Sequence, residues 1–290
     1  MKNIIVIGKG GQLANSIEKI VGSGKFANTL SVEFVGIDGM DITSEGSVRT
    51  YMDGRNFDYV INCAAYTAVD KAEEDTELAY SVNARGSQVL ADYCKSSKIR
   101  MLHVSTDYVF DGRSCQPYSE SDVPNPISVY GSSKLDGEQY IRDILCVDSV
   151  VIRTSWLYSE SDNNFLNTMI HLGKTKDEIN VVFDQIGTPT YAHDLADALL
   201  HISASEDFYS GVFHYSNEGV ASWYDFACAI MELSGLACKV KPVTSECFPT
   251  LAKRPSYSVL NKTKIKGAYS IEIPYWRESL KLAMSTSVCP

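Results

Sequence analysis

Tyr130 and Lys134 lie four positions apart in the run Tyr-Gly-Ser-Ser-Lys. At this spacing on a helix, two side chains lie one above the other on the same face. An ammonium close to a phenol favours the phenolate, so the pair predicts a tyrosine that exchanges protons nearer neutral pH than its ordinary pKa of about 10. Many surface helices carry such a pair without any function. Whether this pair is functional therefore depends on the strands and helices that position it.

A glycine-rich run follows the first apolar segment of the chain. Residues 4–7 are β-branched, which predicts a buried parallel strand, and residues 12–21 have the pattern of a helix. A glycine turn between the two lets backbone N–H groups approach a pyrophosphate at the helix N-terminus. The alternative is an ordinary glycine turn. In the first interpretation, the cofactor contacts come from Gly8, Gly10, Gly11, Gln12 and Leu13.

Strand-like and helix-like segments continue to alternate up to about residue 156. Further strands are expected at 32–37, 59–63, 101–105 and 150–153, with helices at about 71–96 and 132–143. This alternation predicts an α/β fold, a Rossmann-like doubly wound parallel sheet with helices on both faces. The expected dinucleotide-binding domain is residues 1–156.

The pattern is less regular after residue 156. Helices are expected at 164–172, 193–203, 223–234 and 278–284, with a short extended segment at 240–243. We expect residues 157–290 to form mainly a smaller C-terminal α/β lobe that covers the carboxyl edge of the sheet and holds the substrate. Parts of 180–215 are expected to return to the first domain.

Asp38 ends the second expected strand, where an acid can accept hydrogen bonds from the adenosine ribose of a dinucleotide. Such an acid favours NADH, because it repels the 2′-phosphate of NADPH, whereas Lys9 could pair with that phosphate. Turn chemistry beside Gly39 explains Asp38 equally well. The sequence therefore leaves NADPH or NADH open as the cofactor. Asp41 and Ile42 either line the adenine or begin the next helix.

Two more runs end strands at the same expected edge of the sheet. The third strand is followed by Cys63, Ala64, Ala65 and Tyr66. Small residues there let a ligand pass close to the backbone, although packing against the neighbouring helix also explains them. Thr106 ends the fourth strand, and its hydroxyl could bind a carbonyl oxygen together with Tyr130. A strand-end threonine alone is usually a turn residue, so the more specific signal is Thr106, Tyr130 and Lys134 together.

The 290-residue chain has a net charge of -10 and a pI near 5.0, which argue against a nucleic-acid or anionic-membrane surface. No apolar segment approaches the length that spans a membrane. The eight cysteines form no C-x-x-C pair, which predicts reduced thiols in a cytoplasmic protein. His103 and the other four histidines have no metal-ligand spacing, so we expect neither a metal site nor a catalytic role for them.

Taken together, these motifs resemble the extended short-chain dehydrogenase/reductase superfamily. Within it, they are most similar to the dTDP-4-dehydrorhamnose reductase family. The resemblance covers nearly the whole chain. It includes the loop at Gly8, the runs 62–73, 105–112 and 129–134, and the more specific runs Arg153-Thr-Ser-Trp-Leu-Tyr158, Asn163-Asn-Phe165, Asp184-Gln-x-Gly-x-Pro-Thr190 and Arg254-Pro255 with Leu260-Asn261.

The resemblance implies NAD(P)H-dependent reduction of the 4-keto group of dTDP-4-dehydro-L-rhamnose to dTDP-L-rhamnose. It implies that Tyr130 is the general acid, that Lys134 lowers its pKa and holds the nicotinamide ribose, and that Thr106 binds the reacting oxygen. The implied substrate contacts are Thr67, Val69, Tyr108, Trp156, Asn164 and Arg254. Two alternatives stay open: a sugar-nucleotide epimerase or dehydratase of the same superfamily, and a non-catalytic nucleotide-binding regulatory subunit.

Large aromatic residues are more often core than ligand contacts. Only the resemblance assigns Trp156 to the substrate, and we expect Trp223 to lie in the core. Lys253 and Arg254 are adjacent in a proline-flanked loop. They offer cations to the pyrophosphate of a nucleotide sugar, or they form a solvated basic loop.

Some members of the family form a magnesium-bridged dimer through two glutamates. The matching positions here are Ser16 and His193. Neither is a good ligand for magnesium, which prefers carboxylate and water oxygens. We therefore expect no structural magnesium, and a monomer or weak homodimer.

Overall fold

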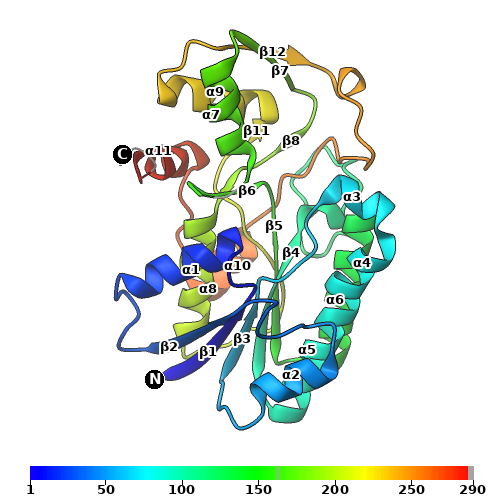
Figure 1. Ribbon diagram of the computed structural model, residues 1–290, viewed down its shortest axis with the longest axis vertical. Helices are drawn as coiled ribbons and strands as arrows, with labels where there is room; N and C mark the ends of the chain where they lie inside the picture. Colours follow the sequence, from blue (N-terminus) through cyan, green and yellow to red (C-terminus); the bar gives the residue numbers. More distant parts are fainter. Residues whose placement is uncertain (162, 287–290) are drawn as a thin grey trace.

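The computed structural model describes residues 1–161 and 163–286 and arranges them around a six-stranded parallel sheet (Figure 1). The strand order is β10-β5-β4-β3-β1-β2. The strands are β1 Lys2–Ile7, β2 Leu30–Val35, β3 Tyr59–Asn62, β4 Arg100–Thr106, β5 Ser149–Thr154 and β10 Gly211–His214. The expected Rossmann-like, doubly wound sheet is confirmed.

The chain runs from β1 to β2 on one side and from β3 towards β10 on the other, so the direction of winding changes between β1 and β3. In open α/β sheets, ligands bind in the crevice outside the carboxyl ends of the strands at such a switch point. Gly8 follows β1 and Cys63 follows β3, which places both expected ligand loops at this point.

Helices cover both faces of the sheet (Figure 1). One face shares an apolar core with α1 Gln12–Gly22, α8 Ala192–Ala204 and α10 Thr263–Tyr269. The other shares a second core with α2 Glu45–Met52, α5 Gly86–Ser97 and α6 Val129–Leu145. Ile4 and Val6 belong to the first core, whereas Ile5 and Ile7 belong to the second. A strand buried on both sides must be apolar at every position, as this one is.

The segment expected as one helix at 71–96 consists of four short elements: α3 Val69–Glu74, α4 Thr76–Tyr80, a π-helical turn η1 Ser81–Arg85, and α5. Asp75 has φ −102° and ψ 45°, which lie outside the helical region, so it separates α3 from α4. π-helical turns occur often at functional sites. This one carries Asn83, which is buried beneath the loop that follows β3.

The sequence pattern does not predict β10, a strand of only four residues. Such a short run cannot be distinguished from a loop by its periodicity. Its position depends on parallel pairing with β5, where Val212 lies opposite Val151. Helix α8 precedes β10 in the chain and packs against α1 beneath the sheet.

Part of the second half of the chain builds a smaller α/β lobe above the carboxyl edge (Figure 1). Its helices are α7 Phe165–Thr175, α9 Trp223–Ser234 and α11 Trp276–Thr286, and they share an apolar core with each other. Strand β7 Glu178–Val182, which the sequence pattern does not predict, pairs in parallel with β12 Lys239–Val243. The remaining short elements are β6 Leu157–Tyr158 paired with β9 Thr190–Tyr191, β8 Ile186–Gly187 paired with β11 Ala221–Ser222, and the 3₁₀ turns η2 Asp107–Val109 and η3 Ser245–Cys247.

Three properties of the described residues bear on the sequence-based expectations. None of their helices has both the length and the apolar character needed to cross a bilayer. In the same part of the chain, no three His, Cys, Asp or Glu side chains gather as a set of metal ligands. The seven described cysteines are free thiols, and Cys289 lies outside the described residues.

Candidate active site

A cleft of about 460 Å³ lies between the carboxyl edge of the sheet and the lobe. Residues from both parts of the chain line it. The expected site residues at its wall are Gly11, Gln12, Leu13, Cys63, Ala65, Thr67, Val69, Thr106, Tyr108, Tyr130, Lys134, Trp156, Asn164 and Arg254. The cleft therefore brings together the glycine loop, the Thr106, Tyr130 and Lys134 set, and the expected substrate residues.

The glycine loop has room for a diphosphate. Gly8 and Gly10 have φ of +101° and +90°, a conformation that other residues rarely adopt. A Cβ on Gly8 would lie 2.9 Å from the Ala64 nitrogen, whereas a Cβ on Gly10 would meet nothing within 4 Å. Gly11 caps α1 without a side-chain acceptor, so the first N–H groups of this helix are available to an anion. These residues fit the pyrophosphate of a dinucleotide.

The loop after β3 is held at two points by buried asparagines that the sequence analysis does not single out. Asn62 Oδ1 accepts from Ala64 N–H at 3.0 Å. Asn83 Oδ1 accepts from Tyr66 N–H at 2.8 Å, and its Nδ2 donates to Ser133 in α6 at 3.0 Å. These bonds fix the backbone of the expected cofactor loop relative to the helix that carries Tyr130.

Several expected cofactor residues lie away from the cleft wall. Asp38 is exposed at the end of the β2 loop, as Lys9 is beside the glycine turn. The carboxylate of Asp41 accepts from Thr43 N–H and Oγ1 in a local turn that leads to α2. Ile42 is buried in the core against Gly86, so its side chain does not face a ligand. Tyr66 turns its hydroxyl to Asp75 at 3.0 Å.

Thr106 and Tyr130 meet at the base of the cleft. Thr106 closes β4 and caps η2, where its Oγ1 accepts from Tyr108 N–H at 3.2 Å. Burial raises the pKa of Tyr130 above its ordinary value, whereas a hydrogen bond with Thr106 lowers it and the Asp107 charge raises it. The phenol keeps its proton at neutral pH, as a group that donates a proton must.

The expectation that Lys134 lowers the pKa of Tyr130 stays a prediction, and the structure gives the lysine two other polar partners. The Nζ atom of Lys134 donates to the Val104 carbonyl at 2.8 Å and lies 3.2 Å from His103 Nε2. Among the described residues, no hydrogen bond joins this Nζ to the tyrosine hydroxyl. Helical spacing places the two side chains on one face, but the length of the lysine chain carries its charge to β4.

Helix α6 is fixed to the sheet by a buried ion pair that the sequence analysis does not predict. Glu138 accepts from Arg153 Nε at 3.0 Å and from Nη2 at 2.6 Å, and both side chains are 2% exposed or less. Ser105 also donates to Glu138. Because Tyr130 and Lys134 lie on the same helix, this pair sets their position relative to β4 and β5.

The lobe side of the cleft carries two stacked tryptophans. The rings of Trp156 and Trp223 are parallel, with centroids 3.7 Å apart. Trp156 has φ of +46°, which is uncommon for a bulky residue and places its ring over Gly187. Trp223, which we expect in the core, packs against the core of the lobe with a half-buried ring and also lines the cleft.

Arg254 and Asn164 are the expected substrate residues with the most polar contacts. Arg254 bonds Asp70 at 2.7 Å and the Tyr108 hydroxyl at 3.1 Å. Asn164 caps α7, and its Nδ2 donates to Gln12 Oε1 at 3.0 Å and to two backbone carbonyls. The asparagine therefore links the glycine-loop helix to the lobe, and its polar atoms are already occupied.

A second, mainly apolar cavity of about 650 Å³ adjoins the cleft inside the lobe. Phe165, Trp223 and Arg254 line both spaces. The adjoining cavity is otherwise walled by α7 and β7, with Met169, Leu172, Ile179 and Val181 among its residues. A ligand can thus extend from Tyr130 past a cation into an apolar space.

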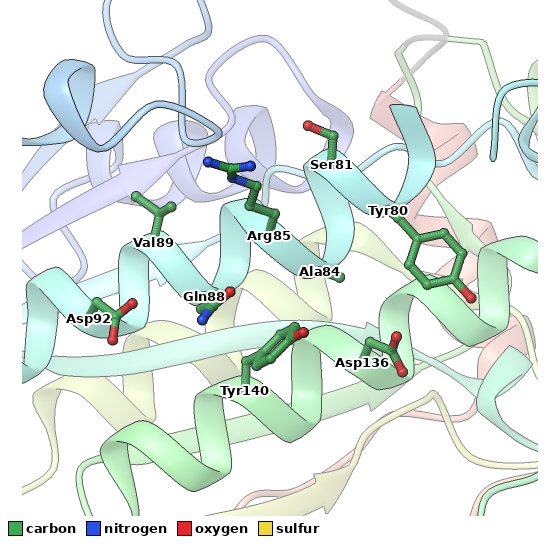
Figure 2. Close-up of a pocket in the computed structure, with 9 residues that line it drawn as sticks. All are labelled: Tyr80, Ser81, Ala84, Arg85, Gln88, Val89, Asp92, Asp136 and Tyr140. Atoms are coloured by element: carbon green, nitrogen blue, oxygen red, sulfur yellow. The ribbon is translucent and has the colours of Figure 1, made fainter. Parts of the chain in front are cut away.

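A third hollow, of about 510 Å³, lies on the outer face of the helices (Figure 2). Asp136 and Tyr140 of α6 face Gln88 and Asp92 of α5 there (Figure 2). Six helical positions separate Tyr130 from Asp136, which turns Asp136 by roughly 120° around α6 to a different face. Among the described residues, none that lines this hollow also lines the cleft.

Comparison with known proteins agrees with this geometry. The family model for the RmlD substrate binding domain matches residues 1–289. The chain is 41% identical to a dTDP-4-dehydrorhamnose reductase of Aggregatibacter actinomycetemcomitans, over 97% of this chain and 98% of the relative.

Two solved structures are similar along their whole length. The dTDP-4-dehydrorhamnose reductase of Clostridium acetobutylicum has a TM-score of 0.92 and 41% identity, and the alignment covers 98% of this chain and 99% of that one. The reductase of Bacillus anthracis, solved in complex with NADP, has a TM-score of 0.92 and 35% identity, covering 99% and 100%. The chain therefore belongs to the dTDP-4-dehydrorhamnose reductase family.

Proposed function

We propose that this protein reduces the 4-keto group of dTDP-4-dehydro-L-rhamnose to give dTDP-L-rhamnose, with NADPH or NADH as the reductant. The observation that carries this proposal is one cleft lined by Thr106, Tyr130 and Lys134, next to a glycine turn that fits a diphosphate. Membership of the reductase family supports the same reaction.

The reaction needs a proton at the ketone oxygen as it is reduced. A bound nicotinamide supplies the hydride to the ketone carbon. Tyr130 donates its phenolic proton to the oxygen, on which negative charge develops, and Thr106 orients that oxygen. General acid catalysis of this kind contributes about 10²- to 10⁴-fold to the rate. Lys134 orients the ribose of the cofactor.

The substrate is a nucleotide sugar that spans the cleft and the adjoining cavity of the lobe. Arg254 supplies a cation for the diphosphate, since a guanidinium binds phosphate oxygens in a bidentate manner. Trp156, Thr67, Val69 and Tyr108 face the sugar from the cleft wall. Residues 1–156, with the segments that return to the sheet, hold the cofactor, and residues 157–290 mainly hold the substrate.

We also propose a cytoplasmic monomer or weak homodimer with no structural magnesium and no nucleic-acid partner. Ser16 is buried in α1 and donates to the Gln12 carbonyl at 2.9 Å, and His193 stacks on Tyr191. Neither residue offers the carboxylate that a bridging magnesium needs.

The test is a spectrophotometric assay with dTDP-4-dehydro-L-rhamnose, run with NADPH and with NADH. We expect consumption of one reduced nicotinamide for each dTDP-L-rhamnose formed. Interconversion of sugars without net consumption of the cofactor would instead identify an epimerase or dehydratase. No turnover, combined with tight binding to another protein, would identify a regulatory subunit.

A further inference from the structure

A continuous chain of hydrogen bonds runs from the loop after β3 to the catalytic lysine. Asn62 Oδ1 lies 3.0 Å from the Ala64 nitrogen, and Asn62 Nδ2 lies 3.1 Å from His103 Nδ1. His103 Nε2 lies 3.2 Å from Lys134 Nζ, which donates to the Val104 carbonyl at 2.8 Å. Asn62, His103 and Lys134 are 1%, 0% and 2% exposed, so the chain is buried, although Lys134 also lines the cleft.

Only one assignment of protons satisfies the chain. The Ala64 N–H can only donate, so the oxygen of Asn62 faces it and the NH₂ group of Asn62 faces His103. An amide NH₂ can only donate, and His103 Nδ1 must therefore accept. A neutral imidazole carries one proton, which then lies on Nε2. This N–H points at Lys134 Nζ, which can accept it only as an uncharged amine.

The charged alternatives place donors against donors. An imidazolium would direct Nδ1–H at the Asn62 NH₂, and a lysine ammonium would direct N–H at His103 Nε2–H. Burial lowers the pKa of His103 well below its ordinary value, and the Lys134 charge acts in the same direction. Burial also lowers the pKa of Lys134 to about 8.

The ionisable groups around Lys134 do not provide a free negative charge that would stabilise its ammonium form. Glu138, one turn along α6, favours the ammonium, but its charge is already paired with Arg153. The Cys63 thiol stays protonated because burial raises its pKa to about 12. Tyr130 also keeps its proton, as described above.

We propose that Asn62 and His103 are positioning residues that hold Lys134 mainly as an uncharged amine in the cofactor-free protein above about pH 8, so that Lys134 gains a proton when a dinucleotide binds there. Asn62 fixes the tautomer of His103. Because the ring then directs its Nε2–H at Lys134, the tautomer favours the uncharged form of that amine. The second half of the proposal rests on the proposed function, in which ribose hydroxyls accept from Lys134. The ammonium gives up its contact with His103 in order to donate to them.

The tautomer can be measured directly in the cofactor-free protein. We expect ¹⁵N NMR of histidine-labelled protein to show His103 with its proton on Nε2 at about pH 9, where Lys134 is mainly uncharged, and to show no titration of the ring near its ordinary pKa. The signal is assigned by its loss in His103→Gln. A proton on Nδ1, or titration of the ring near its ordinary pKa, overturns the proposal.

A single substitution should reverse the tautomer. In Asn62→Asp, the carboxylate accepts from both Ala64 N–H and His103, so we expect the proton of His103 to move to Nδ1. The matched control is Asn83→Asp, an equally buried asparagine that holds the other end of the same loop without touching His103. The control should leave the tautomer on Nε2. The wild-type spectrum decides the tautomer even if a variant fails to fold.

Calorimetry of NADPH binding in buffers of different ionisation enthalpy tests the coupled proton. At about pH 9 we expect the wild type to take up close to one proton per site, and Asn62→Asp, whose lysine is already charged, to take up almost none. Equal uptake by the two proteins overturns the coupling. Failure of NADPH to bind contradicts the proposed function and the coupling, whereas the NMR result stands independently of it.

Discussion

Arg254 Nη2 lies 2.7 Å from Asp70 Oδ2, in a bond that joins a loop of the lobe to the start of α3. The guanidinium also donates to the Tyr108 hydroxyl at 3.1 Å, so its position is defined before any ligand arrives. A phosphate at this point therefore competes with Asp70 for the cation. Breaking the bond between Arg254 and Asp70 costs free energy, which reduces the net contribution of Arg254 to substrate binding.

Replacement of Arg254 by Ala should weaken substrate binding more than catalysis. A hydrogen bond to a charged group contributes about 1.5–3 kcal/mol, so we expect KM to rise by roughly 10- to 100-fold with kcat within a few fold. The matched control is Lys253→Ala, which removes an exposed neighbouring cation and should leave KM near wild type. Steady-state kinetics measures both, and an unchanged KM in Arg254→Ala would remove this residue from the substrate site.

The ion pair between Glu138 and Arg153 should be essential for stability. Removal of one partner from a buried pair typically costs about 3–5 kcal/mol, because the other charge is left without compensation. We expect Glu138→Gln to lower the free energy of unfolding by about this amount in urea. Glu178→Gln, which breaks an exposed pair with Lys241, is the control and should have little effect. Equal stabilities of the two variants would show that α6 is held in another way.

Asp107 should make the protein less stable as the pH rises. Burial raises the pKa of its carboxyl to about 6, although hydrogen bonds with Ser258 and Thr106 lower it. The folded state then binds the proton more tightly than the unfolded chain, whose pKa is near 3.8. The stabilisation of the folded state by the proton on Asp107 is complete below about pH 4 and is lost as the pH rises to about 6.

Substitution of Asp107 by Asn removes this titration. We expect Asp107→Asn to gain stability relative to wild type between pH 4 and pH 7, by up to about 3 kcal/mol. The difference between the two proteins matters here, because other carboxylates titrate in both. Urea unfolding at several pH values measures it, and a difference that does not change with pH would be contrary to a raised pKa.

Gly187 should control the position of Trp156. A Cβ at Gly187 would lie 2.7 Å from Cε2 of this indole, which is stacked on Trp223 and cannot swing aside freely. We expect Gly187→Ala to displace the ring, to change the near-UV circular dichroism and to raise KM. Gly267→Ala is the control, because a Cβ there meets nothing within 4 Å. Identical spectra and KM for Gly187→Ala and wild type would mean that the ring adjusts at no cost.

Local patterns are sufficient to predict five of the six strands of the sheet and the glycine turn. The run at 4–7 is apolar at every position because helices cover both faces of β1, and such a run is visible in the sequence. Thr106, Tyr130 and Lys134 follow from strand ends and helical spacing. Strand β10 could not be predicted, because four residues become a strand only through pairing with β5.

The sequence also does not predict the buried residues that contact Lys134 or that fix α6 to the sheet. His103 lies 31 positions from Lys134, and Asn62 lies 41 positions from His103. Arg153 and Glu138 become partners only once α6 packs on β5. No periodicity or spacing in the sequence marks such contacts, because they depend on register between elements.

The role of Tyr130 can be tested by comparing wild type with Tyr130→Phe in the assay with dTDP-4-dehydro-L-rhamnose and NADPH. The phenylalanine keeps the ring but has no proton to donate to the ketone oxygen. We expect turnover to fall by at least about 10²-fold while the affinity for NADPH, measured by calorimetry, stays within a few fold of wild type. Turnover of the variant near the wild-type rate would contradict the role of Tyr130 as the general acid.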